Sequence, residues 1–143
     1  MAYPDSFLRG ISDKSLINED GSVCSAVFHF WGKKNLPERE DYCHEESIFW
    51  KDDDGAIYLI LSQKKEDGNL QFKSGAVLVD RQLFDELRKF PHIKPYLSYE
   101  RKFSEDNPYH GNLLLKKSVD KFTMKNIAGA IAACCCTDYI PQK

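Results

Sequence analysis

The sequence predicts an α+β fold with a mainly antiparallel sheet of five to seven strands and two helices packed on it. Three observations lead to this prediction. Several runs are rich in β-branched and aromatic residues, and turn signals such as Asp-Gly separate them. Two segments, at about 81–90 and 124–136, repeat apolar residues at helical spacing. Regular helical crossovers between the strands are missing, which argues against a parallel sheet. The 143 residues fit one globular domain, 1–143.

The first predicted strands lie before residue 32. The stretch "SFLRGIS" is a short apolar run that contains one charge, Arg9. The stretch "SVCSAVFHFW" (Ser22–Trp31) alternates and carries apolar residues on both faces, which is typical of a central strand. The residues that follow, up to Glu46, are polar and include Pro37, so we expect a long exposed loop there.

Residues 47–80 predict a three-stranded antiparallel meander. Its strands would be "SIFW", then "AIYLILSQKK", then "LQFKSGAVLVD". The turn "KDDDG" would join the first two strands as a solvated loop, and "EDGN" would form the second hairpin turn. Gly75 within the third strand indicates a bulge or bend.

Helical periodicity returns after this meander. Asp80 is a candidate N-cap for the helix at about 81–90, which Pro91 ends. Pro95–Phe103 alternates as a strand, and "GNLLLKKS" is a strand that we expect to pair with it across the "SEDNP" turn. Thr123 is a candidate cap for the final helix, at about 124–136, whose small residues favour close packing.

Composition and charge limit the classes of function. The net charge of −2 argues against sequence-independent binding to nucleic acid. No apolar stretch is long enough to span a membrane, and the start "MAYPDSFLRG" does not resemble a secretory signal. We therefore expect a cytoplasmic protein without a membrane association. We also expect a bacterial source.

Cysteine and metal-ligand patterns predict neither a disulfide framework nor a metal site. The five cysteines are an odd number, and Cys134–Cys136 are adjacent, so they point in different directions on a helix. The stretch "YCHEE" (Tyr42–Glu46) has no second ligand pair at zinc spacing. We expect no metal and no cofactor.

The stretch "NPYHGNLLL" (Asn107–Leu115) is the strongest candidate site. It sets polar residues, including Asn107, Tyr109 and His110, against three leucines that should be buried. Histidine changes its charge near neutral pH, so His110 suits an acid, a base or an anion contact. If the two flanking strands pair, Glu100 comes within reach of His110. The alternative is structural: His110 fixes the turn by hydrogen bonding. In either case we expect at least one side-chain hydrogen bond from His110.

Arg9 is the second candidate site. A charge in an apolar strand either pairs with buried carboxylates or carbonyls, binds an anionic ligand, or extends to the surface. An anion-binding Arg9 leads to an alternative in which the protein is an enzyme. It is a small enzyme acting on a nucleotide or another phosphate-bearing substrate, with Arg9 on the anion, His110 as acid or base, and Glu100 or Glu46 as the carboxylate.

Aromatic residues predict a different function. Trp31, Trp50 and three further rings, Tyr42, Phe49 and Tyr58, crowd residues 31–58. Tryptophan and tyrosine are common in protein interfaces, although they also fill cores. No standard enzymatic motif is present. The leading prediction is therefore an accessory or interaction protein that acts through a protein partner, with Trp31, Trp50, Arg9, Asn107, Tyr109 and His110 as contact candidates. A homo-oligomer stays open as an alternative.

Overall fold

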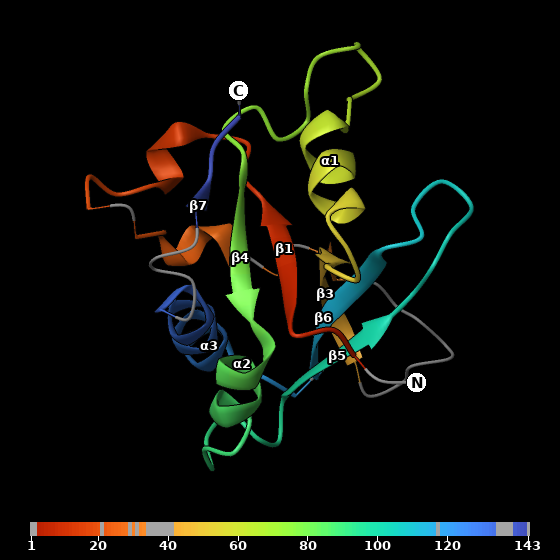
Figure 1. The fold of residues 1–143 in the computed structure, drawn as a ribbon. Helices are drawn as coiled ribbons and strands as arrows, with labels where there is room; N and C mark the ends of the chain where they lie inside the picture. The colour runs from red at the N-terminus through yellow and green to blue at the C-terminus, as the bar shows by residue number, and fades with distance from the viewer. Residues whose placement is uncertain are drawn as a thin grey trace.

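The computed structural model describes residues 3–20, 22–28, 30, 32–33, 42–116, 118–133 and 139–142, with the side chains of 32–33 and 42–44 left out. Figure 1 shows these residues as one sheet with helices on both sides. The strands are β1 (Ser6–Gly10), β2 (Gly32–Lys33), β3 (Tyr42–Trp50), β4 (Ala76–Asp80), β5 (Leu97–Arg101), β6 (His110–Lys116) and β7 (Tyr139–Ile140). The helices are α1 (Gly55–Ser62), α2 (Arg81–Leu87) and α3 (Lys121–Ala133), with 3-10 turns η1 (Lys14–Leu16) and η2 (Ser25–Phe28).

The sheet is antiparallel throughout its recorded pairings. Its order is β5-β6-β3-β1-β4-β7, and the short β2 pairs with β3. The predicted pairing of the strands around the "SEDNP" turn is confirmed, since Leu97 lies opposite Leu115 and Arg101 opposite Gly111. The α+β class with a mainly antiparallel sheet is therefore confirmed.

The two predicted helices are present with shifted ends. Asp80 caps α2 as expected, because its carboxylate accepts from the backbone N–H of Leu83 at 3.0 Å. The final helix begins earlier than expected, at Lys121, and its cap is Asp120 rather than Thr123. The Asp120 carboxylate accepts from the Thr123 N–H at 2.6 Å, which lowers the pKa of Asp120 below its ordinary value. Residues 134–136 lie outside the described residues.

The predicted meander at 47–80 is wrong in its middle. The run after "KDDDG" forms the helix α1, and only β3 and β4 remain as strands of this region. Asp54 is the N-cap of the helix, and the preceding Asp53 accepts from the Gly55 N–H at 2.8 Å. The sequence did contain a signal for this helix. An aspartate is followed by apolar residues at helical spacing, since Ala56 and Ile60 are four positions apart.

The predicted strand at Ser22–Trp31 is also wrong. Its described residues contain the 3-10 turn η2, and Phe30 has a positive φ of 52°. Val23, Val27, Phe28 and Phe30 are all buried, so a turn places in one core the side chains that a strand would divide between two faces. The predicted exposed loop is corrected at its end, where Tyr42–Glu46 belongs to β3.

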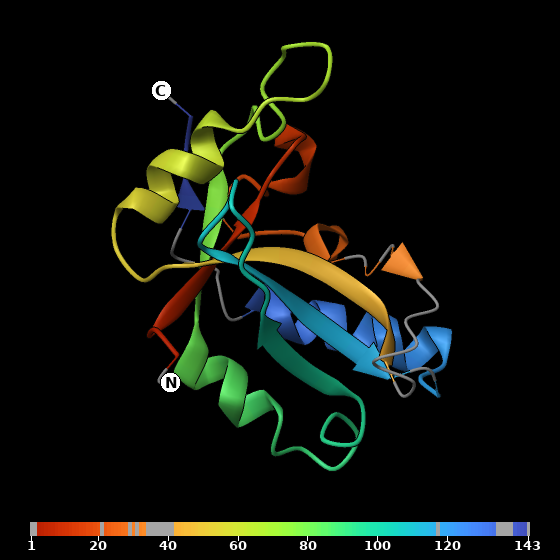
Figure 2. The ribbon, with the colours of Figure 1, turned by 90° about the vertical axis from the view of Figure 1, so that its right-hand side faces the viewer.

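The two faces of the sheet are covered differently (Figure 2). The core face lies toward α2, α3 and η2, and its main cluster includes Phe7, Ile48, Trp50, Leu113, Phe84 and Ile127. The opposite face, called here the α1 face, lies toward α1. There Leu8, Phe49 and Ala76 pack on Ala56 and Ile60.

Among the described residues, no helix has the length and apolar character needed to cross a membrane.

Candidate functional site

Arg9 forms a buried clamp between strands and the η2 segment. Its Nη2 pairs with Glu46 Oε1 at 2.5 Å, its Nε donates to Val27 O at 3.1 Å, and its Nη1 donates to Ser47 O at 3.0 Å. Glu46 accepts a further bond from the Phe30 N–H at 2.8 Å through its other oxygen. Both side chains are therefore engaged with the protein itself.

The clamp has the chemistry of a buried ion pair. Burial lowers the pKa of Arg9, and the charge of Glu46 opposes that shift. Charges out of water are stable only when they are paired and their remaining donors and acceptors are bonded. The structure meets both conditions. The Arg9 donors that would bind an anionic ligand are used to hold η2 onto the sheet.

The turn at Asn107–His110 is held by local hydrogen bonds. Asn107 Oδ1 accepts from the Tyr109 N–H at 3.0 Å, and Tyr109 donates its hydroxyl to Asp53 Oδ1 at 2.7 Å, which raises the pKa of Tyr109. His110 Nδ1 lies 2.9 Å from the Lys102 carbonyl oxygen. The expected side-chain hydrogen bond of His110 is therefore confirmed, as is the burial of the three leucines of β6.

The strand register separates Arg9 from His110. Leu8 lies opposite Phe49, and Phe49 lies opposite His110. Residues directly opposed in an antiparallel sheet share a face, and neighbours along a strand alternate. His110 therefore lies on the α1 face, and Arg9 with Glu46 lies on the core face. The structure does not bring these groups into one centre.

Glu100 lies on the same face as His110 but has another partner. It is opposite Asn112 in the register, and its Oε1 accepts from Asn112 Nδ2 at 3.1 Å. Asn112 is 2% exposed, and its Oδ1 has no hydrogen-bond partner among the residues described. His110 and Glu100 are thus each bonded to a different group of the sheet.

Most of the aromatic candidates with described side chains are core residues. Trp50 is fully buried and donates its indole N–H to Glu100 O at 3.0 Å, and Phe49 is 6% exposed. Tyr58 is the exception at 72% exposure. Trp31 and the side chain of Tyr42 lie outside the described residues. Tyr58 is therefore the residue of this aromatic group that the structure places on a surface.

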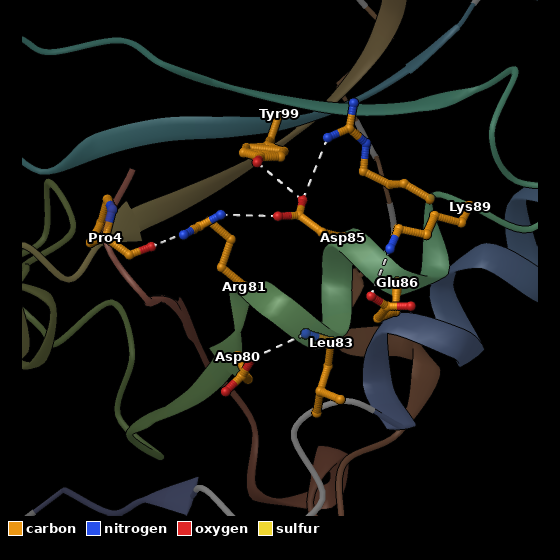
Figure 3. A network of polar contacts seen from close by, with 9 residues as sticks. Pro4, Asp80, Arg81, Leu83, Asp85, Glu86, Lys89 and Tyr99 are labelled. Atoms are coloured by element: carbon orange, nitrogen blue, oxygen red, sulfur yellow. Dashed lines mark hydrogen bonds and ion pairs between the residues drawn. The ribbon is translucent and has the colours of Figure 1, made fainter. Parts of the chain in front are cut away.

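A polar network fixes α2 to β5 (Figure 3). Asp85 accepts from Arg81 Nη1 at 3.0 Å and from the Tyr99 hydroxyl at 3.1 Å, and Arg88 Nη1 lies 3.6 Å from the same carboxylate. Arg81 also donates to Pro4 O at 2.7 Å. Burial and the charge of Asp85 raise the pKa of Tyr99. The Asp85 carboxylate links Arg81, Arg88 and Tyr99, so the network explains how α2 is positioned.

The outer side of α1 is apolar and partly exposed. Only Ala56 and Ile60 of this helix are buried, while Ile57, Leu59 and Leu61 are partly buried and Tyr58 extends into solvent. A helix that is apolar on all sides is normally covered on all sides. Here the described residues cover one side only.

A groove with a volume of about 450 Å³ runs beside this helix. One wall is α1 and its first turn, with Asp54, Ile57, Tyr58, Leu61 and Ser62, and the other is the C-terminal segment Ile140–Gln142. Gly75, at a φ of 103°, allows the backbone of Ile140 and Pro141 to lie against it. Sequence reasoning did not identify Ile57, Leu61, Ile140 or Pro141 as site residues. Ile57 and Leu61 were missed because the α1 segment was interpreted as a strand.

Metal binding has no support from the described side chains, among which no group of three or more histidine, cysteine, aspartate or glutamate residues could hold an ion. The side chains of Cys43 and His44 are outside that set.

Comparison with known proteins gives one distant likeness. No family model matches the chain, and no solved structure matches it. It is 31% identical over 86 residues to a protein named "Structural protein ORF43" from Trichoplusia ni ascovirus 2c. The matched stretch is 58% of this chain and 8% of the viral protein. A little over half of this chain is therefore similar to one small segment of a much longer protein.

Proposed function

We propose that this chain is a small interaction domain that acts through a protein partner, and that α1 and its groove form the contact surface. The observation that carries the proposal is the exposed apolar side of α1, with Tyr58 at 72% exposure beside a 450 Å³ groove. Exposed apolar surface with a protruding tyrosine is typical of protein interfaces.

Two further observations support this choice. Arg9 and Glu46 are bonded within the fold and lie on the face opposite His110, which supports an interaction role over the Arg9–His110 site of the enzyme alternative. The viral protein with a similar segment is named as a structural protein, which is compatible with a role in contacts between chains.

The cytoplasm is the compartment we propose. Cys24 is a free thiol, as is usual in reducing compartments. Fractionation of cells that express the tagged protein would test the location, and recovery from a secreted fraction would contradict it. A bacterial source stays a prediction.

The proposed contact surface can be tested by matched substitutions. The protein is mixed with candidate partners expressed from neighbouring genes, and complexes are detected by size-exclusion chromatography. We expect Tyr58→Asp to abolish a complex that forms with the wild-type chain. Phe122→Asp is the matched control, since Phe122 is 75% exposed on α3, away from the groove.

Thermal unfolding of both variants checks that neither is misfolded. A protein that forms no complex with any candidate would contradict the proposed function. A complex that survives Tyr58→Asp would move the contact surface elsewhere.

A further inference from the structure

We propose that the groove beside α1 binds an extended peptide segment that combines aliphatic side chains with one lysine or arginine. This inference rests on the proposed function and specifies the chemistry of the partner. The aliphatic side chains lie between the two walls of the groove, and the basic side chain lies at the end formed by Asp54 and Tyr58.

The walls of the groove are suited to aliphatic side chains. Ile57 and Leu61 are four residues apart on α1, so they lie on one side of the helix, facing Ile140 and Pro141 across the groove. The volume of about 450 Å³ is within the range of pockets that hold ligands of drug size. A few side chains of a peptide have the same bulk.

The walls are held in place before a partner arrives. Gln142 donates its Nε2 to Leu61 O at 2.7 Å and to Phe72 O at 3.1 Å, which ties the C-terminal segment to α1. β7 also pairs with β4 through Ile140 and Tyr139. A preformed groove lowers the ordering cost of binding.

One end of the groove is suited to a cation. Asp54 and Tyr58 are separated by one helical turn, and both line the groove. The Asp54 side chain is 82% exposed. An ammonium or guanidinium group can contact the tyrosine ring face and the carboxylate together.

Asp54 differs from the two aspartates before it. Asp52 is held by both terminal nitrogens of Arg101, and Asp53 accepts from Tyr109 and Gly55. Within the described part of the chain, the Asp54 side chain makes no capping hydrogen bond. Its recorded ion pair is with Lys51 at 3.5 Å. Such an exposed pair contributes little and can be replaced by a partner's cation.

The test is selection from a random peptide library displayed on phage. The wild-type chain is the target, and selected peptides are synthesised and their Kd values measured by fluorescence anisotropy. We expect enriched peptides with aliphatic residues next to a lysine or arginine. Leu61→Asp should abolish binding, and Phe122→Asp should leave it unchanged.

A charge exchange tests the basic residue. Asp54→Lys should weaken a selected peptide about threefold to tenfold, which is the range for an exposed ion pair combined with a cation–π contact. Replacing the peptide's basic residue by glutamate should restore binding to Asp54→Lys. Glu105→Lys is the matched control for a change of net charge, because Glu105 is exposed in the loop between β5 and β6.

The outcomes separate the two proposals. If selected peptides bind Leu61→Asp as well as the wild type, the groove is not their binding site. The proposed contact surface would then be wrong too. If binding needs Leu61 but does not change in Asp54→Lys, the groove remains a contact surface. The proposed lysine or arginine of the peptide at Asp54 would then be wrong. Self-association that Tyr58→Asp abolishes would make a second copy of the chain the occupant, and would also overturn this inference.

Discussion

On the core face, α2, α3 and η2 cover the strands, and the polar groups there bond to one another. On the α1 face, a single helix of eight residues covers Leu8, Phe49 and Ala76 and leaves its own outer side exposed. The charged residues that stood out in the sequence, Arg9 and Glu46, lie on the closed face. The surface that we propose for a partner combines aliphatic residues with Tyr58 and Asp54. A conspicuous charge in a strand is here explained by contacts within the fold, whereas the partly exposed side of α1 is the surface that we propose for a partner.

The largest effect is expected at the clamp on the core face. Arg9→Met leaves the Glu46 carboxylate buried without its cation, and this should lower the free energy of unfolding by about 3–5 kcal/mol. The double variant Arg9→Met, Glu46→Leu should recover part of that loss, because no lone charge remains buried. Urea denaturation measures both. A loss below about 1 kcal/mol for the single variant would show that the pair is solvated.

The next prediction compares the two sides of α1. Ile60 is 1% exposed, so Ile60→Ala should cost about 2–5 kcal/mol by leaving a cavity. Tyr58→Ala on the outer side should change the free energy of unfolding by no more than about 0.5 kcal/mol. Urea denaturation compares the two. A Tyr58→Ala variant that loses as much as Ile60→Ala would mean that the outer side of α1 is covered within this chain.

On the α1 face, a substitution of His110 distinguishes a structural role from a functional one. His110→Ala removes the bond to the Lys102 carbonyl, and we expect it to lower the free energy of unfolding by about 1 kcal/mol, with binding reduced only as far as stability is. His92→Ala is the control, since His92 is exposed in the segment after α2. Unchanged thermal stability with a selective loss of binding or turnover would instead assign His110 to a functional site.

The smallest effect is expected at the start of α3, and it depends on pH. The Thr123 N–H lowers the pKa of Asp120 in the folded state. The carboxylate therefore contributes stability above its ordinary pKa of 3.8, and that contribution is lost as the pH falls through the folded-state pKa. Asp120→Ala should lower the Tm slightly at pH 7. The difference from the wild type should shrink in acid, as measured by thermal melts, with Asp106→Ala as the control. A Tm difference that stays constant down to pH 2 would contradict this assignment.

Local sequence signals determined several elements. The helix at Arg81–Leu87 follows from its Asp80 cap and apolar spacing, and the hairpin of β5 and β6 follows from alternation around a turn. The burial of Leu113, Leu114 and Leu115 follows from their composition. These features depend on residues close together in the sequence, so the sequence alone contains the information for them.

Tertiary structure decided the remainder. A short apolar run such as Ala56–Leu61 fits the period of a strand or of a helix, and only packing on Leu8 and Phe49 selects the helix. The 3-10 turn at Ser25–Phe28 is held to the sheet by long-range hydrogen bonds, because Arg9 bonds to Val27, 18 residues away, and Glu46 bonds to Phe30, 16 residues away. The exposure of Tyr58 beside the burial of Trp50 has the same origin. Which residues meet, and which stay in water, depends on contacts between distant parts of the chain, and no local pattern encodes them.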